Sequence, residues 1–308
     1  MAQKAKDFID LADFSGQQLR FLLERAVADK AAFRAGKLPV SLGRTVLAMI
    51  FEKASLRTRV SFEAAMTQLG GHAIYLTRED IGLGTREPVQ DVARVLGRMC
   101  DAIVARTFSH EAVRDLGRHA RVPVINALTD YSHPCQAMAD LMTVQEHFGD
   151  LKGRKLAFIG DGNNVARSLA VGCARLGMAF ALACPKGYEL EKAFVDALPA
   201  ESFRMMRDPH EAAAGADVIY TDTWVSMGQE AQRAARAKAF QGYQVNAALL
   251  KAAPPHAIVL HCLPAYRDCE ISAEVLEAHA ESIFTQAENR LHFQRTLLHV
   301  LVAEGGVP

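Results

Sequence analysis

The chain has 308 residues, half of them hydrophobic, so it is long enough for two hydrophobic cores of ordinary domain size. Lys plus Arg and Asp plus Glu each total 35, and this balance excludes the broad positive field that attracts nucleic acid or an anionic membrane. No apolar run reaches the roughly 18 residues of a membrane span, and the cysteines, without a CxxC pair or signal-peptide pattern, predict free thiols in a reducing, cytoplasmic compartment.

The first half of the chain predicts a helix followed by a strand, a helix and a strand. Ser15–Gln18 has the pattern of a capping box, and leucines at helical spacing follow it. Residues 45–51 predict an apolar strand, 57–69 a helix and 73–76 a second strand. Residues 134–148 have helical spacing and are followed by glycine, so we expect a domain boundary near this point.

The second half repeats the alternation and predicts a second parallel sheet. Apolar runs predict strands at 155–160, 179–183, 217–221, 257–261 and 282–285. Residues 287–302 predict a long final helix, and residues 230–238 fit either a loop or a short helix. The predicted fold class is therefore α/β, with two doubly wound domains that each have a central parallel sheet flanked by helices.

A candidate anion site lies where the first strand gives way to a helix. Unpaired backbone N–H groups and the helix dipole favour an anion there, and Ser55 and Thr58 add hydroxyl groups. Arg57 adds a planar group that can hold two phosphate oxygens at once. Taken alone, the motif fits equally well a capped helix whose arginines are solvated.

Two further polar features follow in the same half. Arg106 ends an apolar strand, a position where open α/β sheets bind ligands. His133-Pro-Cys-Gln136 stands at the start of the next helix, where the histidine alone would more often cap or pack and the glutamine would be exposed. Three such features in one domain favour a binding site.

In this order the motifs resemble the carbamoyl-phosphate site of the aspartate/ornithine carbamoyltransferase family. That site consists of a Ser-Thr-Arg-Thr-Arg helix start, an arginine that ends a strand, and a His-Pro-x-Gln turn. Leu56 replaces the first threonine, so only its backbone N–H can serve there. The resemblance implies a carbamoyl-phosphate site made of Ser55, Leu56, Arg57, Thr58, Arg106, His133 and Gln136.

Motifs in the second half resemble the ornithine branch of this family. Asp161-Gly-Asn-Asn164, Asp222-Thr-Trp-Val-Ser226-Met227-Gly228 and His261-Cys262-Leu263-Pro264 each follow a predicted strand. A carboxylate such as Asp222 suits an ammonium group, whereas a dicarboxylate acceptor would need cations. The resemblance implies that ornithine is bound by Asn164, Asp222, Ser226 and Met227. It also implies that the carbamoyl phosphate is contacted by Cys262, Leu263 and, on the last helix, Arg290.

The resemblance further implies an activity and an assembly. The expected reaction carries the carbamoyl group to the δ-amino group of L-ornithine, with catalytic roles for Arg106, His133, Cys262 and Asp222 and with no cofactor or metal. The expected domains are a carbamoyl-phosphate-binding domain at 1–148, rejoined by a helix at 288–308, and an ornithine-binding domain at 149–287. We expect a homotrimer or a multiple of trimers, in which residues 80–85 reach the neighbouring subunit, although Gly82 lacks the polar side chain of many relatives.

Other functions stay open at this point. Gly160-Asp161-Gly162 after a strand is typical of a dinucleotide-binding oxidoreductase, but the third glycine and the acidic ribose partner are missing. Singly, Asn164 fits a helix cap, Ser226–Gly228 an ordinary loop and Cys262 a small buried hydrophobe. A sister transferase acting on an N-acylated ornithine or putrescine, and a homologue without turnover, are the nearer alternatives.

Overall fold

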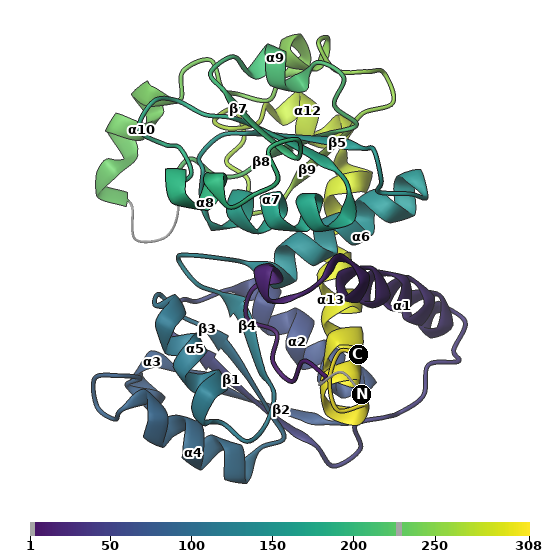
Figure 1. The fold of residues 1–308 in the computed structure, drawn as a ribbon, viewed down its shortest axis with the longest axis vertical. Coiled ribbons are helices and arrows are strands. Elements are labelled where there is room, and N and C mark those ends of the chain that lie inside the picture. The colour runs from purple at the N-terminus through teal and green to yellow at the C-terminus, as the bar shows by residue number, and fades with distance from the viewer. Residues whose placement is uncertain (1–3, 226–229) are drawn as a thin grey trace. The chain divides into compact units, whose positions relative to one another are not determined.

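The computed structural model describes residues 4–225 and 230–308, which form two compact α/β units (Figure 1). Unit 1 contains the chain up to Met142 together with Asn289–Pro308, and unit 2 contains Thr143–Glu288. The C-terminal segment therefore rejoins the first unit, as predicted. In the part of the chain that the structure describes, every helix is too short or too polar to cross a membrane.

Unit 1 is built on a parallel four-stranded sheet with the order β2-β1-β3-β4. Its strands are β1 (Val46–Phe51), β2 (His72–Thr77), β3 (Ala102–Arg106) and β4 (Val124–Leu128). Its helices are α1 (Gly16–Arg34), α2 (Leu56–Gln68), α3 (Arg78–Ile81), α4 (Val89–Met99), α5 (His110–His119), most of α6 (Pro134–Phe148) and the second half of α13 (Ala280–Leu298). The short 3-10 helix η1 (Leu11–Asp13) precedes α1, and the π-helix η3 (His299–Ala303) follows α13.

The side chains of this sheet alternate between its two faces, as the period of a strand requires. Ala48 and Ile50 of β1 and Ile103 and Ala105 of β3 all belong to one buried cluster with residues of α4 and α5. The strands β1 and β3 are thus buried on both faces, and this explains why they are apolar runs in the sequence rather than alternating patterns.

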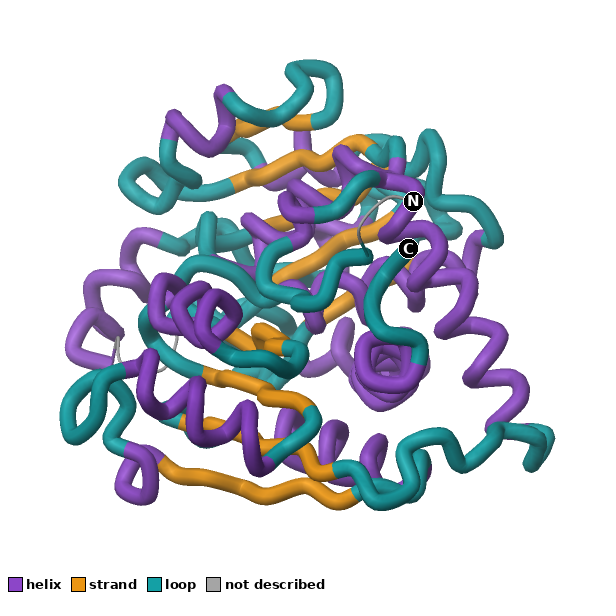
Figure 2. The backbone as a smooth tube through the Cα atoms, turned by 60° about the horizontal axis from the view of Figure 1, so that its bottom comes forward, coloured by secondary structure: helices purple, strands orange, loops and turns teal. Residues whose placement is uncertain are grey.

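Unit 2 has a parallel five-stranded sheet with the order β7-β6-β5-β8-β9. Its strands are β5 (Lys155–Ile159), β6 (Ala179–Ala183), β7 (Phe203–Met206), β8 (Val218–Thr221) and β9 (Ile258–His261). Its helices are α7 (Asn164–Leu176), α8 (Lys192–Asp196), α9 (Pro209–Ala213), the 3-10 helix η2 (Glu230–Gln232), α10 (Arg233–Ala239), α11 (Ala247–Leu250), α12 (Ala273–Ala278) and the first part of α13. Figure 2 shows the orange strands of each unit with purple helices beside them.

The core of unit 2 is also two-sided. Ala157 and Ile159 of β5 pack in one cluster with residues of α9, α11 and α12. Phe158 points the opposite way and stacks on Tyr220 of β8, with ring centroids 5.2 Å apart. Both faces of the central strand are therefore covered.

Each sheet has one place where the strand order reverses, and there the carboxyl ends of two neighbouring strands diverge into loops. In unit 1 this place lies between β1 and β3, where Phe51 pairs with Arg106. In unit 2 it lies between β5 and β8, where Ile159 pairs with Thr221. Such reversal points are where doubly wound sheets bind ligands, so the fold places one candidate site on each unit.

The predicted elements are mostly confirmed, but one predicted strand is wrong and the strands β4 and β7 were not predicted. The capping box of Ser15 and Gln18 starts α1, and the helix predicted at 134–148 is α6. The strand predicted at 282–285 is wrong, because these residues lie in α13. Within this segment Ile283 is fully buried and Phe284 is 54 % exposed, so only one side of the helix packs against the core.

Candidate active site

The start of α2 has the geometry of an anion site. Ser55 is the N-cap, and its hydroxyl accepts a hydrogen bond from the backbone N–H of Thr58 at 3.3 Å. The Ser55 and Thr58 hydroxyl oxygens are 3.1 Å apart. Leu56 is the first helical residue, and with 74 % of its surface exposed it takes no part in the core.

Arg290 of α13 joins two of the predicted motifs. Its guanidinium donates to the side-chain oxygen of Gln136 at 2.6 Å and to the hydroxyl of Thr58 at 3.2 Å. Arg106 also donates to the Thr58 hydroxyl, at 3.5 Å. Both arginines are buried, so residues separated by more than 200 positions meet in one polar cluster of unit 1.

Gln136 is held in one amide orientation. Its Nε2 donates to the carboxylate of Asp140 at 2.7 Å, one helical turn later, while its Oε1 accepts from Arg290. Asp140 is fully buried and was missed by the sequence analysis, although the spacing of four residues on one helix could have indicated the pair. The second lone pair of Gln136 Oε1 leaves capacity for a ligand N–H.

His133 is kept neutral by its surroundings. Burial is the main cause that lowers the pKa of its imidazole well below 6.5, and the positive charges of Arg290, Arg106 and Arg57 act in the same direction. A neutral imidazole adds no further charge to a cluster already rich in cations. This cluster therefore suits a doubly charged anion held mainly by arginines.

Lys53 is a second residue that the sequence analysis missed. Its ammonium forms an ion pair with Asp130 and lies 4.3 Å from the centre of the Phe108 ring. Its backbone carbonyl accepts from Nε of Arg106 at 3.2 Å. The loop after β1 is thereby tied to the end of β3, which fixes the direction of the Arg106 side chain.

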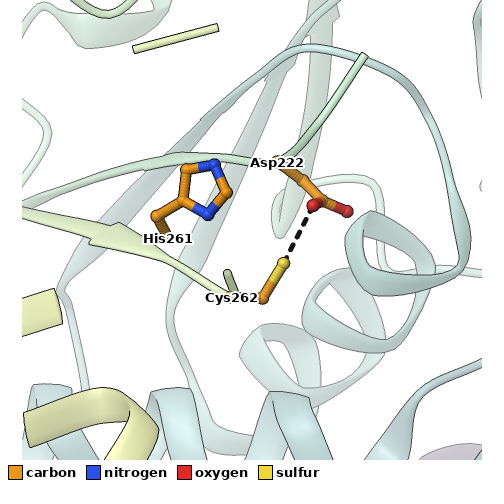
Figure 3. Close-up of side chains that lie close together, drawn as sticks. All are labelled: Asp222, His261 and Cys262. Carbon is orange, nitrogen blue, oxygen red and sulfur yellow. Dashed lines mark hydrogen bonds between the residues drawn. The ribbon is translucent and has the colours of Figure 1, made fainter. Parts of the chain in front are cut away.

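Unit 2 carries a carboxylate at its own reversal point. Asp222 follows β8 directly and accepts hydrogen bonds from the thiol of Cys262 at 2.9 Å, from Nδ2 of Asn163 at 2.7 Å and from the backbone N–H of Thr223 at 2.7 Å. Figure 3 shows the Cys262 sulfur pointing toward Asp222, with His261 beside them. All three donors are neutral, so the negative charge of Asp222 stays available to a cation.

A buried pair fixes the turn after β9. His261 accepts from the backbone N–H of Leu263 at Nδ1, at 2.8 Å, and its Nε2 lies 3.1 Å from Oε1 of Glu270. Since Nδ1 is the acceptor, we assign the proton to Nε2, which donates to Glu270. Leu263 has a left-handed backbone with φ of 56°, and the hydrogen bond to His261 stabilises it.

The same three side chains have the composition of a metal site. Ligand atoms of Asp222, His261 and Cys262 all lie within 4.8 Å of one another. Both ring nitrogens of His261 are already engaged, however, and the Cys262 thiol keeps a proton that it donates to Asp222. A metal would have to displace these bonds, so the arrangement fits a hydrogen-bonded cluster better than a metal centre.

The ornithine residues predicted from the sequence have different outcomes. Asn163, not Asn164, is the N-cap of α7, and it is also the asparagine that donates to Asp222. Asn164 is the first helical residue, and its backbone carbonyl accepts from the Ser168 hydroxyl at 3.0 Å. Ser226 and Met227 lie outside the described residues, so their predicted roles stay predictions.

The glycines after β5 have a structural explanation that removes the case for a dinucleotide. A Cβ atom on Gly162 would lie 2.7 to 2.8 Å from backbone atoms of residues 188–190. Its N–H donates to the carbonyl of Tyr188 at 2.8 Å. The glycine is needed because another part of the chain approaches it closely.

Gly82 also follows from backbone geometry. It caps α3 in the left-handed conformation with φ of 53°, and a Cβ atom there would lie 2.7 Å from Cβ of Arg86. Asp80 and Thr77 form the capping box at the other end of α3. The absence of a polar side chain at position 82 therefore matches the turn that this chain adopts.

Comparisons with known proteins agree with the division of the chain into two units. A family model described as the carbamoyl-P binding domain of aspartate/ornithine carbamoyltransferase matches residues 6–146, and one described as its Asp/Orn binding domain matches residues 152–301. The ornithine carbamoyltransferase of Bacillus subtilis strain 168 is 50% identical over 307 residues, which cover 97% of this chain and 95% of that protein. The ornithine carbamoyltransferase of Carboxydothermus hydrogenoformans is 47% identical over 306 residues, which cover 97% and 98%.

Solved structures are similar over the whole chain. The ornithine carbamoyltransferase from Pyrococcus furiosus has a TM-score of 0.93 at 45% identity and covers 98% of both chains. The enzyme of the same description from Thermus thermophilus has a TM-score of 0.88 at 43% identity and covers 97% of this chain and 100% of that one.

Proposed function

The chain belongs to the aspartate/ornithine carbamoyltransferase family, and we propose that it transfers the carbamoyl group of carbamoyl phosphate to the δ-amino group of L-ornithine. The products are L-citrulline and phosphate, and the reaction belongs to arginine biosynthesis. The observation that carries the assignment to residues is the contact of Arg290 with both Gln136 and Thr58. It unites three motifs of the predicted carbamoyl-phosphate site.

In this proposal, residues 1–148 with 288–308 bind carbamoyl phosphate and residues 149–287 bind ornithine. The reversal points of the two sheets support this division, because the one in unit 1 presents cationic side chains and the one in unit 2 presents a carboxylate. Arg57, Arg106 and Arg290 supply the positive charge that a phosphate dianion needs. Asp222 supplies the negative charge that an α-ammonium group needs.

The phosphate is bound by Ser55, Arg57, Arg290 and the backbone N–H of Leu56 at the start of α2. Charge-assisted hydrogen bonds from arginine are shorter and stronger than neutral ones, and the helix N-terminus adds unpaired N–H groups. These contacts strengthen as the C–O bond breaks, because the leaving phosphate gains charge. They therefore lower the barrier as well as hold the substrate.

The carbonyl oxygen of the substrate is polarised by Arg106, His133 and the Thr58 hydroxyl. Negative charge grows on this oxygen when the amine adds to the carbon, and donors fixed in a buried site stabilise it without reorganising. The free lone pair of Gln136 Oε1 and the carbonyls of Cys262 and Leu263 accept the hydrogens of the carbamoyl NH₂ group. This orients the carbon toward the incoming amine.

Ornithine is bound by Asp222 through its α-ammonium group, with Asn164, Ser226 and the backbone of Met227 at the rest of its amino-acid end. The δ-amino group must attack in its neutral form. A bond forms between its nitrogen and the carbonyl carbon, the bond from that carbon to the phosphate oxygen breaks, and the nitrogen loses a proton that the departing phosphate can accept. Cys262 stays a protonated thiol on Asp222 in this scheme, so no covalent enzyme intermediate forms.

We also propose that the chain acts in the cytoplasm as a homotrimer or a multiple of trimers. All six cysteines are free, which suits a reducing compartment. Unit 1 exposes several apolar side chains, and an interface with a second copy would remove them from water. They are Leu56, Val60, Ile74, Val95 and Met99. Light scattering after size-exclusion chromatography gives the mass of the assembly directly.

The test of the reaction is a product assay with four amines. Purified protein is incubated with carbamoyl phosphate and, separately, ornithine, N-acetylornithine, putrescine and aspartate, and each ureido product is measured. Citrulline as the dominant product is expected. A ureido product from another amine would refute the acceptor, and no product from any amine would refute the activity.

A further inference from the structure

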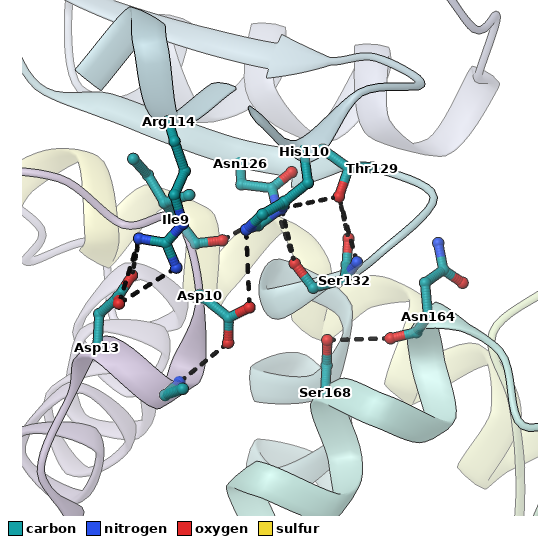
Figure 4. Close-up of polar contacts among 11 residues, drawn as sticks. Ile9, Asp10, Asp13, His110, Arg114, Asn126, Thr129, Ser132, Asn164 and Ser168 are labelled. Atoms are coloured by element: carbon teal, nitrogen blue, oxygen red, sulfur yellow. Dashed lines mark hydrogen bonds and ion pairs between the residues drawn. The ribbon is translucent and has the colours of Figure 1, made fainter. Parts of the chain in front are cut away.

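A buried polar cluster lies behind the turn that leads into His133. In Figure 4, His110 of α5 points toward Thr129 and Ser132 on one side and toward Asp10 on the other. Nδ1 of His110 is 3.0 Å from the Thr129 hydroxyl and 3.5 Å from the Ser132 hydroxyl. Nε2 lies 3.9 Å from a carboxylate oxygen of Asp10, which is beyond hydrogen-bonding distance. None of these residues belongs to the carbamoyl-phosphate site described above.

The turn itself is closed by hydrogen bonds between its two ends. The backbone N–H of Thr129 donates to the carbonyl of Ser132 at 2.9 Å, and the N–H of Ser132 donates to the Thr129 hydroxyl at 3.2 Å. Asn126 donates to the Ser132 hydroxyl at 3.0 Å. His133 is the next residue, and its carbonyl receives the first hydrogen bonds of α6. Any shift of this turn therefore moves His133.

Polar contacts hold the turn in place on both of its sides. The Tyr131 side chain at its tip is 42 % exposed, and the ring lies 4.8 Å from that of His110. Asp130 is anchored from the outside by Lys53. Thr129 and Ser132 face inward, are buried, and meet His110. The imidazole is thus the inner support of the turn.

The protonation state of His110 fits this role. Burial lowers its pKa, and burial also raises the pKa of Asp10, while Arg114, Asp13 and Glu111 are the other charged groups that act on the imidazole. A neutral imidazole with its proton on Nε2, facing Asp10, has a lone pair on Nδ1. The Thr129 hydroxyl can then donate to Nδ1 while it accepts from the N–H of Ser132.

We propose that His110 is a positioning residue for the carbamoyl-phosphate site, because its contacts with Thr129 and Ser132 fix the Thr129–Ser132 turn and with it the place of His133. The inference rests on the proposed function only in its kinetic test, which measures citrulline formation. Orientation contributes a large share of catalysis in transfer reactions, so a small displacement of His133 lowers the rate more than it lowers stability. The effect falls on the carbonyl-polarising donors and not on ornithine binding.

Two substitutions at position 110 separate this role from a packing role. His110→Phe keeps a ring against Tyr131 but removes the acceptor for Thr129. His110→Asn loses the ring but keeps an oxygen near the position of Nδ1, so it restores the hydrogen bond. His119→Phe is the control, because His119 lies on the same helix and its Nδ1 contacts the carbonyl of Asp115 on that helix, at 2.9 Å.

We expect kcat to fall by about tenfold in His110→Phe, the effect of one lost hydrogen bond at a site that depends on orientation, with the KM for ornithine within about twofold of wild type. His110→Asn should stay within about threefold of wild-type kcat even though its Tm is the lower of the two. His119→Phe should match wild type. Equal losses in His110→Phe and His110→Asn, or losses that follow the order of Tm, would overturn the proposal.

A second readout does not depend on turnover. The imidazole resonances of His133 in 15N-labelled protein should shift in His110→Phe and return in His110→Asn, with or without carbamoyl phosphate. If wild type forms no citrulline, the proposed function fails, and this spectrum still decides the positioning role. An unchanged His133 signal in His110→Phe would overturn it.

Discussion

Replacing Arg290 by methionine tests the centre of the carbamoyl-phosphate site. Methionine keeps most of the aliphatic stem but removes the guanidinium, which donates to Gln136, Thr58 and Gln294. Loss of the charge-assisted hydrogen bonds to the phosphate costs about 3 kcal/mol of transition-state stabilisation, or roughly 150-fold in kcat/KM. We expect this loss in citrulline formation, measured under subsaturating carbamoyl phosphate.

The effect on folding should be much smaller. Removing a buried guanidinium leaves three neutral oxygens without this donor, but it also removes the desolvation cost of the charge, so the free energy of unfolding should change by only about 1 to 2 kcal/mol. The matched control is Arg295→Met on the same helix. Arg295 is equally buried, with 1 % exposed against 2 % for Arg290, and it donates to Gln68 at 2.7 Å and to the carbonyl of Asp29 at 3.1 Å.

The two variants should differ in activity and not in stability. Arg290→Met should also raise the pKa of His133 toward its ordinary value, because Arg290 is the largest charge that lowers it after burial. This is measured by an NMR titration of the imidazole. Equal losses of kcat/KM in Arg290→Met and Arg295→Met, or a His133 pKa that does not rise, would refute the assignment of Arg290 to the site.

Three further predictions concern other parts of the chain. Asp222→Asn should raise the KM for ornithine by at least about tenfold, the value of one charge-assisted hydrogen bond, and leave carbamoyl-phosphate affinity by calorimetry unchanged; equal weakening of both would indicate misfolding. Burial lowers the pKa of His133 and His279 below the ordinary 6.5, so the unfolded chain takes up protons near this pH that the folded chain does not. Urea titrations should therefore give a free energy of unfolding that falls as the pH drops through about 6.5. A constant free energy from pH 7 to 5 would contradict this. Gly82→Ala should lower stability by about 1 kcal/mol or more because of the left-handed backbone and the contact with Arg86, whereas an unchanged Tm would show that α3 can re-form its cap.

Strands and motifs at the ends of strands could be predicted from the sequence because parallel strands are buried on both faces and stand out as apolar runs. The strand β7 (Phe203–Met206) was not predicted, because it lacks such a run. It lies at the edge of its sheet, and two of its four residues, Arg204 and Met205, are exposed. No continuous apolar run marks such a strand.

The residues that support the site were harder to predict than those proposed to contact the substrates. Asn163 and Asn164 are adjacent, and only the backbone at the start of α7 decides which of them caps the helix and reaches Asp222. Glu270 lies nine positions after its partner His261, and no local pattern joins the two. Such contacts form only when the tertiary structure brings the two residues together, so the local sequence around either residue does not predict them.

The zero net charge of the chain conceals a division that fits the reaction. In unit 1, Arg57, Arg106 and Arg290 surround a histidine that is itself uncharged, so the cluster offers positive charge from groups that do not titrate near neutral pH. In unit 2, Asp161 is paired with Arg236, whereas the donors to Asp222 are neutral, so one carboxylate retains its charge. In the proposed function, a dianion and an ammonium group are therefore selected by different sheets, each at the reversal point where its strands diverge. Reversing the charge in unit 2 alone should remove only the affinity for the ammonium group. Asp222→Lys should therefore abolish ornithine binding in calorimetry while carbamoyl phosphate still binds, and retention of ornithine binding in that variant would contradict the division.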